Sequence, residues 1–349
     1  MILLTGGAGF IGSHIAEALL DAGEPVRVLD ALLPAAHREP PEIPDDAEFV
    51  HGDLRDAETV RAALHGVDAV CHQAGMVGLG TDFDDVVDYT AHNDLGTAML
   101  LRELAQRRFA GRLVLASSMV VYGEGAYACA EHGAVRPAPR READLRAGRF
   151  EPGCPSCGAP LRPRAVGEDE PTEPRNVYAA TKLHQEHLCA CFVRERPDVS
   201  LTALRYHNVY GPRMPRETPY AGVASLWASA LAAGRAPLVF EDGGQLRDFV
   251  HVRDVARANV TALCAPEPAP GVFNVASGQP RPIVELARAL HAAFADVGAP
   301  EPLLTGGFRL GDVRHVFASP EHAARELGFR AREPFAPTVA ELARAPLRA

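Results

Sequence analysis

Short apolar runs alternate with helix-forming segments along the first half of the chain. The runs that read as strands lie at residues 2–4, 26–29, 48–54, 68–75 and 112–118. Segments with helical character lie between them, for example at residues 15–20 and 56–65. Strands that alternate with helices are typical of a parallel sheet with helices on both faces. The pattern therefore predicts an α/β fold with a doubly wound parallel sheet.

The second half of the chain departs from this alternation. Residues 126–170 are rich in Pro, Arg, Gly and Cys and poor in apolar side chains, so they read as an insertion. We expect a helix from Asn176 to about Arg194, a strand at residues 199–206 and a helix at residues 220–233. The pattern after that is less regular. A chain of 349 residues is long enough for about two domains.

A glycine-rich turn follows the first predicted strand and precedes the first predicted helix. Its sequence is Thr5-Gly6-Gly7-Ala8-Gly9-Phe10-Ile11-Gly12, which contains both G-x-G-x-x-G and G-x-x-G-x-x-G spacings. Glycines allow the backbone to approach a pyrophosphate, whose charge is stabilised at the N-terminus of the helix. Ordinary turns also contain glycine, but the strand–turn–helix context favours a Rossmann-type dinucleotide-binding site.

Asp30 ends the second predicted strand, roughly 20 residues after the glycine turn, where dinucleotide-binding folds place a carboxylate on the adenosine ribose. A carboxylate there repels a 2′-phosphate, so we expect NAD rather than NADP as the cofactor. The alternative is a solvated acid at the end of a strand. Asp53, Ala74, Gly75 and Ser118 fall at further strand ends. Together these strand ends indicate a ligand-binding cleft.

The composition excludes some classes of function. The formal net charge of −10 argues against a nucleic-acid surface, which requires a basic patch. No run of the sequence approaches the roughly 18 consecutive apolar residues of a membrane-spanning helix. The chain starts directly with a predicted strand, so we expect no signal peptide and a cytoplasmic location. Nucleic acids and membranes are therefore not expected as partners.

The chain contains a single lysine, Lys182, although Lys and Arg together number 35. Lys182 lies four residues after Tyr178 in a predicted helix, so the two side chains share one helical face. A nearby ammonium group lowers the pKa of a phenol from its usual value of about 10, which makes the phenol a usable base near neutral pH. Ser118 is placed to hydrogen-bond the same substrate oxygen. The alternative, a surface tyrosine and a solvated lysine, does not explain why one lysine alone is retained.

Two short motifs in the insertion carry potential metal ligands. They are Cys129-Ala130-Glu131-His132-Gly133 and Cys154-Pro155-Ser156-Cys157-Gly158. Two such turns can supply the four ligands of tetrahedral zinc. The alternatives are a disulfide, which a cytosolic context disfavours, and free thiols on a loose loop, although a long loop without a core requires a staple. We therefore expect a structural, zinc-knuckle-like site formed by Cys129, His132, Cys154 and Cys157, without an open position for catalysis.

Longer motifs resemble the extended short-chain dehydrogenase/reductases and, within them, the nucleotide-sugar 4-epimerases. The resemblance covers nearly the whole chain. Its motifs are TGGAGFIG at 5–12, Asn93-x-x-Gly-Thr, SSMVVYGE at 117–124, YAATK at 178–182, RYHNVYGPR at 205–213, RDFVHVRDVA at 247–256 and RLGD at 309–312. The cysteine-containing insertion is most similar to the branch that holds dTDP-L-rhamnose 4-epimerases and UDP-glucose 4-epimerase-like proteins.

The resemblance implies an NAD-dependent 4-epimerase of nucleotide-diphosphate sugars that works through a transient 4-keto sugar. It implies that Ser118, Tyr178 and Lys182 are catalytic, with Tyr178 as the acid and base. The implied NAD-binding residues are Gly6, Gly9, Phe10, Ile11, Gly12, Asp30, Asp53, Leu54, Ala74, Asn93, Tyr178 and Lys182. The implied substrate-binding residues are Ser118, Asn208, Arg247, Arg309 and Asp312.

The same resemblance suggests how the chain is divided. An NAD-binding Rossmann domain is expected at residues 1–206, with the insertion at 126–170 and a return at 247–272. A smaller α/β substrate domain is expected at residues 207–246 and 273–349. The resemblance further implies a homodimer through the predicted helices at 83–107 and 176–194. Apolar faces on these helices could equally belong to the core of one chain.

Related enzymes catalyse other reactions on the same scaffold. The family's 4,6-dehydratases place Asp-Glu directly after the catalytic Ser or Thr, and its UDP-glucuronate decarboxylases carry Glu in the second place. Met119 and Val120 occupy these places here and cannot transfer protons, which favours simple epimerisation. A non-catalytic NAD-binding module does not need the Ser-Tyr-Lys set. The segments at 76–83 and 212–222, which line the sugar in this family, depart from the family's pattern. The resemblance therefore does not identify the sugar or the nucleotide base of the substrate.

Overall fold

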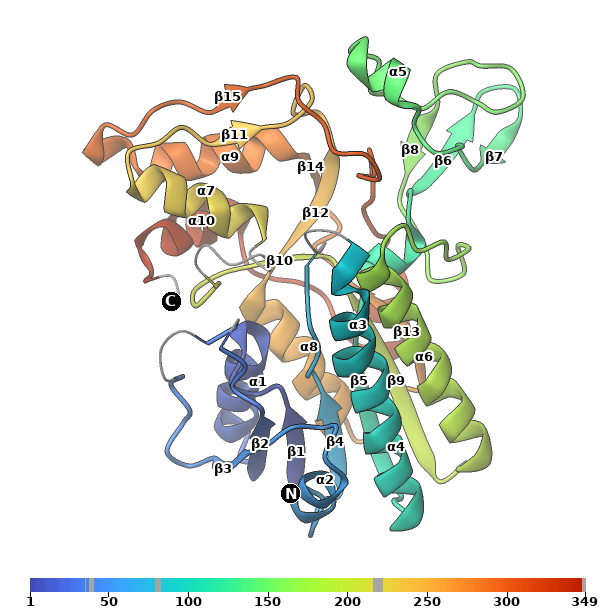
Figure 1. Cartoon of the computed structure of the whole chain (residues 1–349), viewed down its shortest axis with the longest axis vertical. Helices are drawn as coiled ribbons and strands as arrows, with labels where there is room; N and C mark the ends of the chain where they lie inside the picture. The colour runs from blue at the N-terminus through green and yellow to red at the C-terminus, as the bar shows by residue number, and fades with distance from the viewer. Residues whose placement is uncertain (35, 38–40, 79–82, 216–221, 347–349) are drawn as a thin grey trace.

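A seven-stranded parallel sheet forms the centre of the molecule (Figure 1). The computed structural model describes residues 1–34, 36–37, 41–78, 83–215 and 222–346. Across the sheet the strands follow the order β13 (Gly271–Val275), β9 (Val199–Tyr206), β5 (Gly111–Ser118), β4 (Ala69–His72), β1 (Ile2–Thr5), β2 (Val26–Asp30) and β3 (Glu48–His51). All neighbouring strands are parallel. The predicted doubly wound parallel sheet is therefore confirmed.

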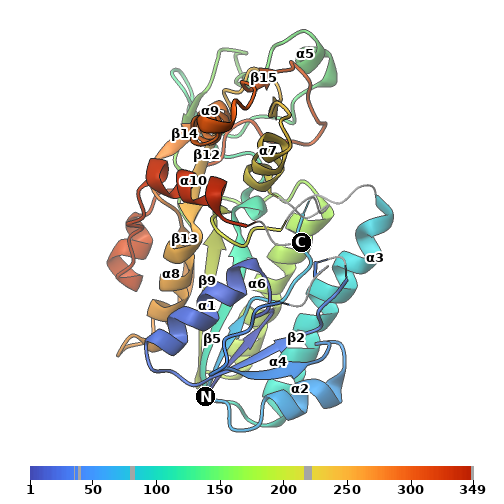
Figure 2. The ribbon, with the colours of Figure 1, turned by 90° about the vertical axis from the view of Figure 1, so that its left-hand side faces the viewer.

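Helices cover both faces of this sheet (Figures 1 and 2). One face carries α1 (Phe10–Asp21) and α8 (Val252–Cys264), and the other carries α2 (Ala57–Ala63), α4 (Gly96–Gln106) and α6 (Val177–Glu195). Successive strand residues point to opposite faces. Leu4 thus packs in the core with α1, and Leu3 packs in the core with α2 and α4. Burial on both faces explains why these strands read as continuous apolar runs.

The helical segment before β5 is not uniform. The sequence predicts one long helix at residues 83–107. The structure instead has η1 (Phe83–Asp85), α3 (Val86–Tyr89), the π-helical turn η2 (Thr90–Leu95) and α4 in direct succession. Single π-helical turns often occur at functional sites. This one contains Asn93, which contributes to the site described below.

The insertion is folded, which corrects the expectation of a loop without a core. It begins shortly after η3 (Met119–Tyr122), the 3₁₀ turn that follows Ser118. The strands β6 (Ala126–Cys129), β7 (Gly133–Val135) and β8 (Arg162–Arg164) form an antiparallel sheet, and α5 (Glu142–Arg146) follows β7. Tyr127 and Leu161 form its small core together with Cys129 and Cys154. Figure 1 shows the insertion projecting beyond the carboxyl ends of the central strands.

The C-terminal unit also lies beyond the carboxyl ends of the central strands, beside the insertion (Figure 1). Its strands are β10 (Asn208–Tyr210), β12 (Leu246–His251) and β14 (Pro280–Pro282) in one sheet and β11 (Leu238–Val239) and β15 (Leu303–Leu304) in another. Its helices are α7 (Val223–Ala232), α9 (Ile283–Ala293), the short η4 (Ala295–Val297) and α10 (Phe335–Arg344). Trp227, Leu286 and Val339 belong to a hydrophobic cluster that joins α7, α9 and α10.

The chain passes more than once between the central sheet and the C-terminal unit. β13 runs to Val275, past residue 272, where the sequence places the end of the return segment. The π-helical turn η5 (Ala323–Leu327) packs beside β13, and Phe329 belongs to the core of the central sheet. These segments therefore lie with the central sheet, although the sequence assigns them to the second domain. The division into two domains stays a prediction.

No helix among the described residues is long and apolar enough to cross a membrane. Of the two segments expected to line the sugar, residues 79–82 and 216–221 lie outside the described residues. The remaining parts of these segments include Met76, Val77 and Met214, which line the cavity described next.

Candidate active site and metal centre

A cavity of about 650 Å³ lies at the carboxyl ends of the central strands. Ligands of open α/β sheets bind at this edge. The glycine turn, several strand ends and α6 line one side of the cavity, and the C-terminal unit lines the other. The predicted site residues in its wall are Gly6, Gly9, Phe10, Ile11, Gly12, Asp30, Asp53, Leu54, Ala74, Ser118, Tyr178, Lys182 and Asn208. One cavity is thus lined by most of the residues that the sequence predicts to form the active site.

The glycine turn is too tightly packed to accept side chains. Gly6 has a φ of +68°, and a Cβ atom there would lie 2.7 Å from the backbone of Ala74. A Cβ atom on Gly12 would lie 2.1 Å from the carbonyl oxygen of Gly6. α1 begins directly after Gly9, and Phe10 in its first turn lines the cavity. The turn and the helix N-terminus form a backbone cradle suited to a pyrophosphate.

Asp30 and Asp53 lie in the cavity wall after neighbouring strands. The Asp30 carboxylate accepts hydrogen bonds from the backbone N–H groups of Ala8 at 3.0 Å and Leu32 at 2.9 Å. The bond from Ala8 ties the end of β2 to the glycine turn. The Asp53 carboxylate pairs with Arg55 at 2.6 Å, and hydrogen bonds from Arg55 lower the pKa of Asp53. Asp30 is held by backbone groups and lies 3.6 Å from His37 Nε2, whereas Asp53 pairs with a guanidinium group, so Asp30 is the better acceptor for ligand hydroxyls.

Tyr178 and Lys182 lie one turn apart on α6 and line the cavity together with Ser118. Asn176 caps the helix, because its Oδ1 atom accepts a hydrogen bond from the backbone N–H of Ala179 at 2.8 Å. Burial raises the pKa of Tyr178 to about 12, and a hydrogen bond with Ser118 opposes this rise. Burial lowers the pKa of buried Lys182 to about 8.

The expectation that Lys182 lowers the pKa of Tyr178 is wrong for the protein chain alone. Attraction between an ammonium group and a phenolate lowers the pKa of a phenol, whereas removing the phenolate from water raises it. At Tyr178 the effect of burial is the larger one. Tyr178 therefore requires a further positive charge nearby before it can act as a base near neutral pH.

Asn93 is buried behind the cavity wall and is not among the described residues that line the cavity. Its Oδ1 atom accepts a hydrogen bond from the backbone N–H of Met76 at 2.7 Å. Its Nδ2 group donates to the Met76 carbonyl at 3.0 Å and to the Thr181 hydroxyl at 2.9 Å. Asn93 thus joins the turn after β4 to the helix that carries Tyr178 and Lys182. In the described structure, its side chain positions the site from behind.

A buried ion pair beside Ser118 was missed by the sequence analysis. Glu186 on α6 binds Arg205 of β9 through two hydrogen bonds of 2.9 and 2.8 Å. The same carboxylate accepts a hydrogen bond from the Ser117 hydroxyl at the end of β5. These contacts hold the end of β5 against α6. One signal for Glu186 is present in the sequence, since it lies one turn after Lys182 and shares its helical face.

Arg247, Arg309 and Asp312 lie outside the described wall of the cavity. Arg247 on β12 is partly buried, and its guanidinium group donates to three backbone carbonyl groups. Arg309 is exposed, and its guanidinium group lies 5.2 Å from the ring centre of Phe240. Burial raises the pKa of Asp312, and the charges of Arg247 and Arg309 oppose this rise. The three residues are therefore electrostatic neighbours, and their roles in binding stay predictions.

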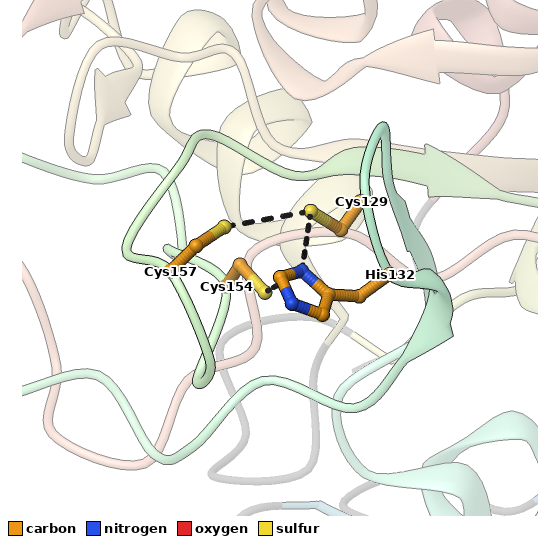
Figure 3. A group of neighbouring side chains, drawn as sticks. All are labelled: Cys129, His132, Cys154 and Cys157. Carbon is orange, nitrogen blue, oxygen red and sulfur yellow. Dashed lines mark hydrogen bonds between the residues drawn. The ribbon is translucent and has the colours of Figure 1, made fainter.

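The four predicted metal ligands come together in the insertion (Figure 3). The Nδ1 atom of His132 lies 3.5 Å from the Sγ atom of Cys129 and 3.7 Å from that of Cys154. The Sγ atoms of Cys129 and Cys157 lie 3.7 Å apart. All four ligand atoms lie within 4.8 Å of one another. Two segments that are distant in sequence thus supply one compact group of ligands.

The local backbone of both motifs suits a metal centre. Gly133 has a φ of +67° and Gly158 a φ of +73°, which glycine adopts most readily. Backbone N–H groups of Glu131 and His132 lower the pKa of the Cys129 thiol, as suits a thiolate ligand. All three cysteines of the cluster are free, and the 3.7 Å between the sulfur atoms of Cys129 and Cys157 exceeds a disulfide bond of about 2.05 Å. The cluster therefore has the composition and closeness of a four-ligand metal site.

Comparison with protein families matches residues 2–143 and 157–276 to the NAD dependent epimerase/dehydratase family. The two matched segments leave out residues 144–156, which belong to the insertion. The chain is also similar to the dTDP-L-rhamnose 4-epimerase of Burkholderia thailandensis, with 34% identity over 335 residues. That alignment covers 94% of this chain and 90% of the relative.

Two solved structures have a similar fold over nearly the whole chain. One is the UDP-glucose 4-epimerase of Thermus thermophilus in complex with NAD, with a TM-score of 0.76 and 29% identity. The match covers 98% of this chain and 97% of that one. The other is the UDP-N-acetylglucosamine 4-epimerase of Methanobrevibacter ruminantium M1 in complex with UDP-N-acetylmuramic acid, with a TM-score of 0.78 and 26% identity. That match covers 98% of this chain and 96% of the other.

Proposed function

Because this chain belongs to the NAD dependent epimerase/dehydratase family, we propose that it is an isomerase, an NAD-dependent nucleotide-sugar 4-epimerase. The observation that carries the proposal is that Ser118, Tyr178 and Lys182 line the same cavity as the glycine turn. Proton transfer at the sugar and cofactor binding would therefore occur side by side. The names of the similar 4-epimerases support the same reaction.

The residues of the cradle fit NAD. The backbone of Gly6, Gly9 and Gly12 would hold the pyrophosphate, because side chains at Gly6 and Gly12 would collide with neighbouring backbone and distort the turn. Asp30 would accept hydrogen bonds from the adenosine ribose and would repel a 2′-phosphate. When bound, NAD supplies reversible hydride acceptance at C4 of the sugar and a positive charge beside Tyr178. Asn93 would support this site through Met76.

The side chains that line the cavity can transfer the proton of the sugar 4-hydroxyl. Tyr178 takes the proton from the sugar 4-hydroxyl, while Ser118 hydrogen-bonds the same oxygen. Loss of the C4 hydride to the bound cofactor would leave a transient 4-keto sugar in the cavity. Lys182 lies one turn from Tyr178 on the same helix, but burial raises the pKa of Tyr178, so the phenolate would also need the positive charge of the bound cofactor. After the sugar presents its other face, return of the hydride to C4 from the opposite side, together with return of the proton from Tyr178 to the 4-oxygen, would invert the configuration at C4 without net oxidation.

The C-terminal unit would bind the nucleotide-diphosphate part of the substrate. Arg247 and Arg309 offer planar guanidinium groups that match phosphate oxygens. Asn208 lines the cavity, and its buried Oδ1 atom has no hydrogen-bond partner among the described residues. That atom is therefore available to a donor on the sugar. Asp312 lies with the two arginines and completes the predicted substrate set.

Dehydration and decarboxylation are the competing reactions on this scaffold. Met119 and Val120, the first residues of η3, line the cavity directly after Ser118. Neither side chain can donate or accept a proton. These two positions therefore do not supply the additional acid and base that a dehydratase needs. A non-catalytic NAD-binding module has no need of Ser118, Tyr178 and Lys182 in one cavity. Simple epimerisation is the reaction that this set of side chains supports best.

We further propose that the cluster in the insertion binds structural zinc. For Zn–S bonds of about 2.3 Å and Zn–N bonds of about 2.05 Å, tetrahedral geometry places two sulfur ligands about 3.8 Å apart. It places a sulfur and a nitrogen ligand about 3.6 Å apart. Three of the six ligand separations match these values, with 3.7 Å between the sulfur atoms of Cys129 and Cys157 and 3.5 and 3.7 Å from His132 Nδ1 to the sulfur atoms of Cys129 and Cys154. All six lie within 4.8 Å. Four protein ligands leave no open position, which favours a structural role.

A homodimer is proposed through the segments at 83–107 and 176–194. Phe83 is 75% exposed and Val87 is 70% exposed, although large apolar side chains usually avoid water. Both lie in the helical segment that packs beside α6. Light scattering on the purified protein tests this proposal: a mass of two chains supports it, and a monomer at all concentrations contradicts it.

The substitution Tyr178→Phe tests the proposed function. The variant keeps the ring and removes the hydroxyl that transfers the proton. We expect it to retain NAD, measured by the absorbance of cofactor released on denaturation, and to lose turnover of nucleotide sugars by a factor of about 10² or more. A variant that retains wild-type turnover contradicts the assignment of Tyr178 as the acid and base.

A further inference from the structure

A buried arginine of the insertion, Arg140, reaches the C-terminal unit. Its Nη1 group pairs with the Glu241 carboxylate at 2.8 Å, and its Nη2 group donates to the carbonyl oxygen of Asp312 at 2.6 Å. Both side chains of the Arg140–Glu241 pair are almost fully buried. A buried pair of this kind holds two segments in a fixed relation, because separating its partners leaves an uncompensated charge. The insertion is therefore fixed against the segment that carries Asp312.

A second arginine extends this contact. The buried guanidinium group of Arg314 binds Glu241 at 2.9 Å and Asp242 at 2.7 Å. It also binds Glu151 of the insertion at 2.6 Å, and the Glu151 carboxylate forms a further hydrogen bond with His315 at 2.9 Å. Two residues of the insertion, Arg140 and Glu151, thus hold the segment that follows Asp312.

The backbone of Glu241 supports a specific role for this contact. Glu241 has a φ of +54°, a conformation that costs a residue with a side chain energy and that glycine or asparagine adopts more readily. Its carboxylate nevertheless satisfies both Arg140 and Arg314. The surrounding structure therefore holds a glutamate in a strained conformation at the point where the insertion and the C-terminal unit meet.

The segment held in this way lies at the predicted diphosphate site. Arg247 donates to the carbonyl groups of Val313 and Arg314, so it is fixed by the same segment. Arg309 stacks over Phe240, the residue before Glu241. The arginines proposed to bind the diphosphate thus contact residues that the insertion holds or that lie next to them in sequence.

In sequence, the metal ligands lie close to the residues that form these contacts. Glu151 lies three residues before Cys154, and β6 links Cys129 to the turn that follows Ser118. The whole insertion lies in sequence between Ser118 and Tyr178. A bound metal that orders both motifs would therefore also order the segment that carries Glu151.

We propose that the insertion positions the nucleotide-diphosphate end of the substrate site, with Arg140 as the positioning residue, an inference that rests on the proposed function. Arg140 acts through Glu241 and the Asp312 segment and need not touch the reacting atoms. It should therefore affect the binding of the nucleotide more strongly than the chemical step. The binding of NAD, whose cradle lies on the other side of the cavity, should be unaffected.

The test compares Arg140→Ala and Arg140→Lys with Arg141→Ala as the matched control. Arg141 is the next residue, is 80% exposed and pairs only locally with Asp144 in the described structure. The probes are UDP and dTDP, titrated by calorimetry into the metal-replete protein, and a nucleotide sugar that the wild type turns over. For Arg140→Ala we expect Kd and KM to rise at least about tenfold, with kcat at saturation changed less than about threefold and NAD content unchanged. Arg140→Lys should recover part of the affinity, because it keeps the charge but not the planar fork.

A second measurement on the wild type avoids any folding defect of the variants. Removal of the metal with a chelator should raise the Kd of the same nucleoside diphosphate while NAD stays bound. Equal nucleotide affinities in Arg140→Ala, Arg141→Ala and the wild type would overturn the positioning role and leave the proposed function intact. Loss of NAD together with nucleotide binding would also overturn it, because the effect would then be general unfolding. A wild-type protein that binds neither UDP nor dTDP and turns over no nucleotide sugar would overturn the proposed function itself.

Discussion

Ser117 at the end of β5 donates a hydrogen bond to the carboxylate of Glu186 on α6. This contact joins the strand that carries Ser118 to the helix that carries Tyr178. Glu186 also holds Arg205 of β9 with two hydrogen bonds. One buried carboxylate therefore helps to fix the relative placement of two proposed catalytic side chains.

Glu186→Gln keeps the shape of this side chain and removes its charge. We expect the free energy of unfolding to fall by about 3–5 kcal/mol, because Arg205 is left as a buried charge without a carboxylate. We also expect kcat to fall about tenfold, because Ser118 and Tyr178 lose their fixed relation. Denaturant titration and steady-state kinetics measure the two effects. Glu195→Gln, at an exposed position on the same helix, should change neither. A variant with reduced stability and normal kcat would limit Glu186 to a structural role.

The lowered pKa of Lys182 predicts a pH dependence of stability. Burial lowers this pKa to about 8 from an ordinary value of 10.5. Below pH 8 the ammonium is charged in both states, and the folded state carries the full cost of burying it. Between about pH 8 and 10 the unfolded state binds more protons than the folded state, so the wild type gains stability relative to Lys182→Met by about 1.4 kcal/mol per pH unit. Denaturant titrations of both proteins from pH 7 to pH 10 measure this change. A difference that stays constant with pH would contradict the burial of a charged Lys182.

Asp30 should determine the choice of cofactor. The wild type should bind NAD more tightly than NADP, because the Asp30 carboxylate repels a 2′-phosphate. Asp30→Asn should weaken NAD binding about tenfold through the loss of charge-assisted hydrogen bonds, and it should reduce the discrimination against NADP. Calorimetry with both cofactors measures these affinities, and Asp21→Asn at the exposed end of α1 is the control. Tighter binding of NADP than NAD by the wild type would show that Asp30 does not have this role.

The metal cluster should hold one zinc ion per chain. Elemental analysis of the purified protein measures the content, and we expect Cys154→Ser and His132→Ala to lose the metal and to unfold at a lower temperature. Cys191→Ser, at an exposed thiol on α6 outside the cluster, should keep both properties. A wild-type chain that is fully folded and contains no zinc would contradict the proposal.

Much of the fold and part of the site follow from local sequence. The central strands read as apolar runs because both faces of the sheet are buried, and the glycine turn reads clearly because its backbone leaves no room for side chains at Gly6 and Gly12. The contact between the two cysteine motifs could also be predicted, because each motif carries two metal ligands at a fixed spacing. Local chemistry of this kind does not depend on knowing the rest of the fold.

Features that depend on contacts between distant segments were not predicted. The Arg140–Glu241 and Glu186–Arg205 pairs join parts of the chain that nothing in the local pattern connects, and arginine is too common here to mark a site. The pKa of Tyr178 was predicted in the wrong direction, because the spacing to Lys182 reveals the nearby charge but not the burial of the phenol. The π-helical turn around Asn93 is likewise invisible in the helical periodicity.

The central claim is tested most directly by incubating the protein with dTDP-rhamnose, UDP-glucose, UDP-galactose and UDP-glucuronate in the presence of sub-stoichiometric NAD. Mass spectrometry and proton NMR then follow each sugar. The account predicts, for at least one nucleotide sugar, a product of unchanged mass whose C4 proton coupling shows inversion. A product that has lost water or carbon dioxide would contradict it and would assign the protein to a dehydratase or a decarboxylase.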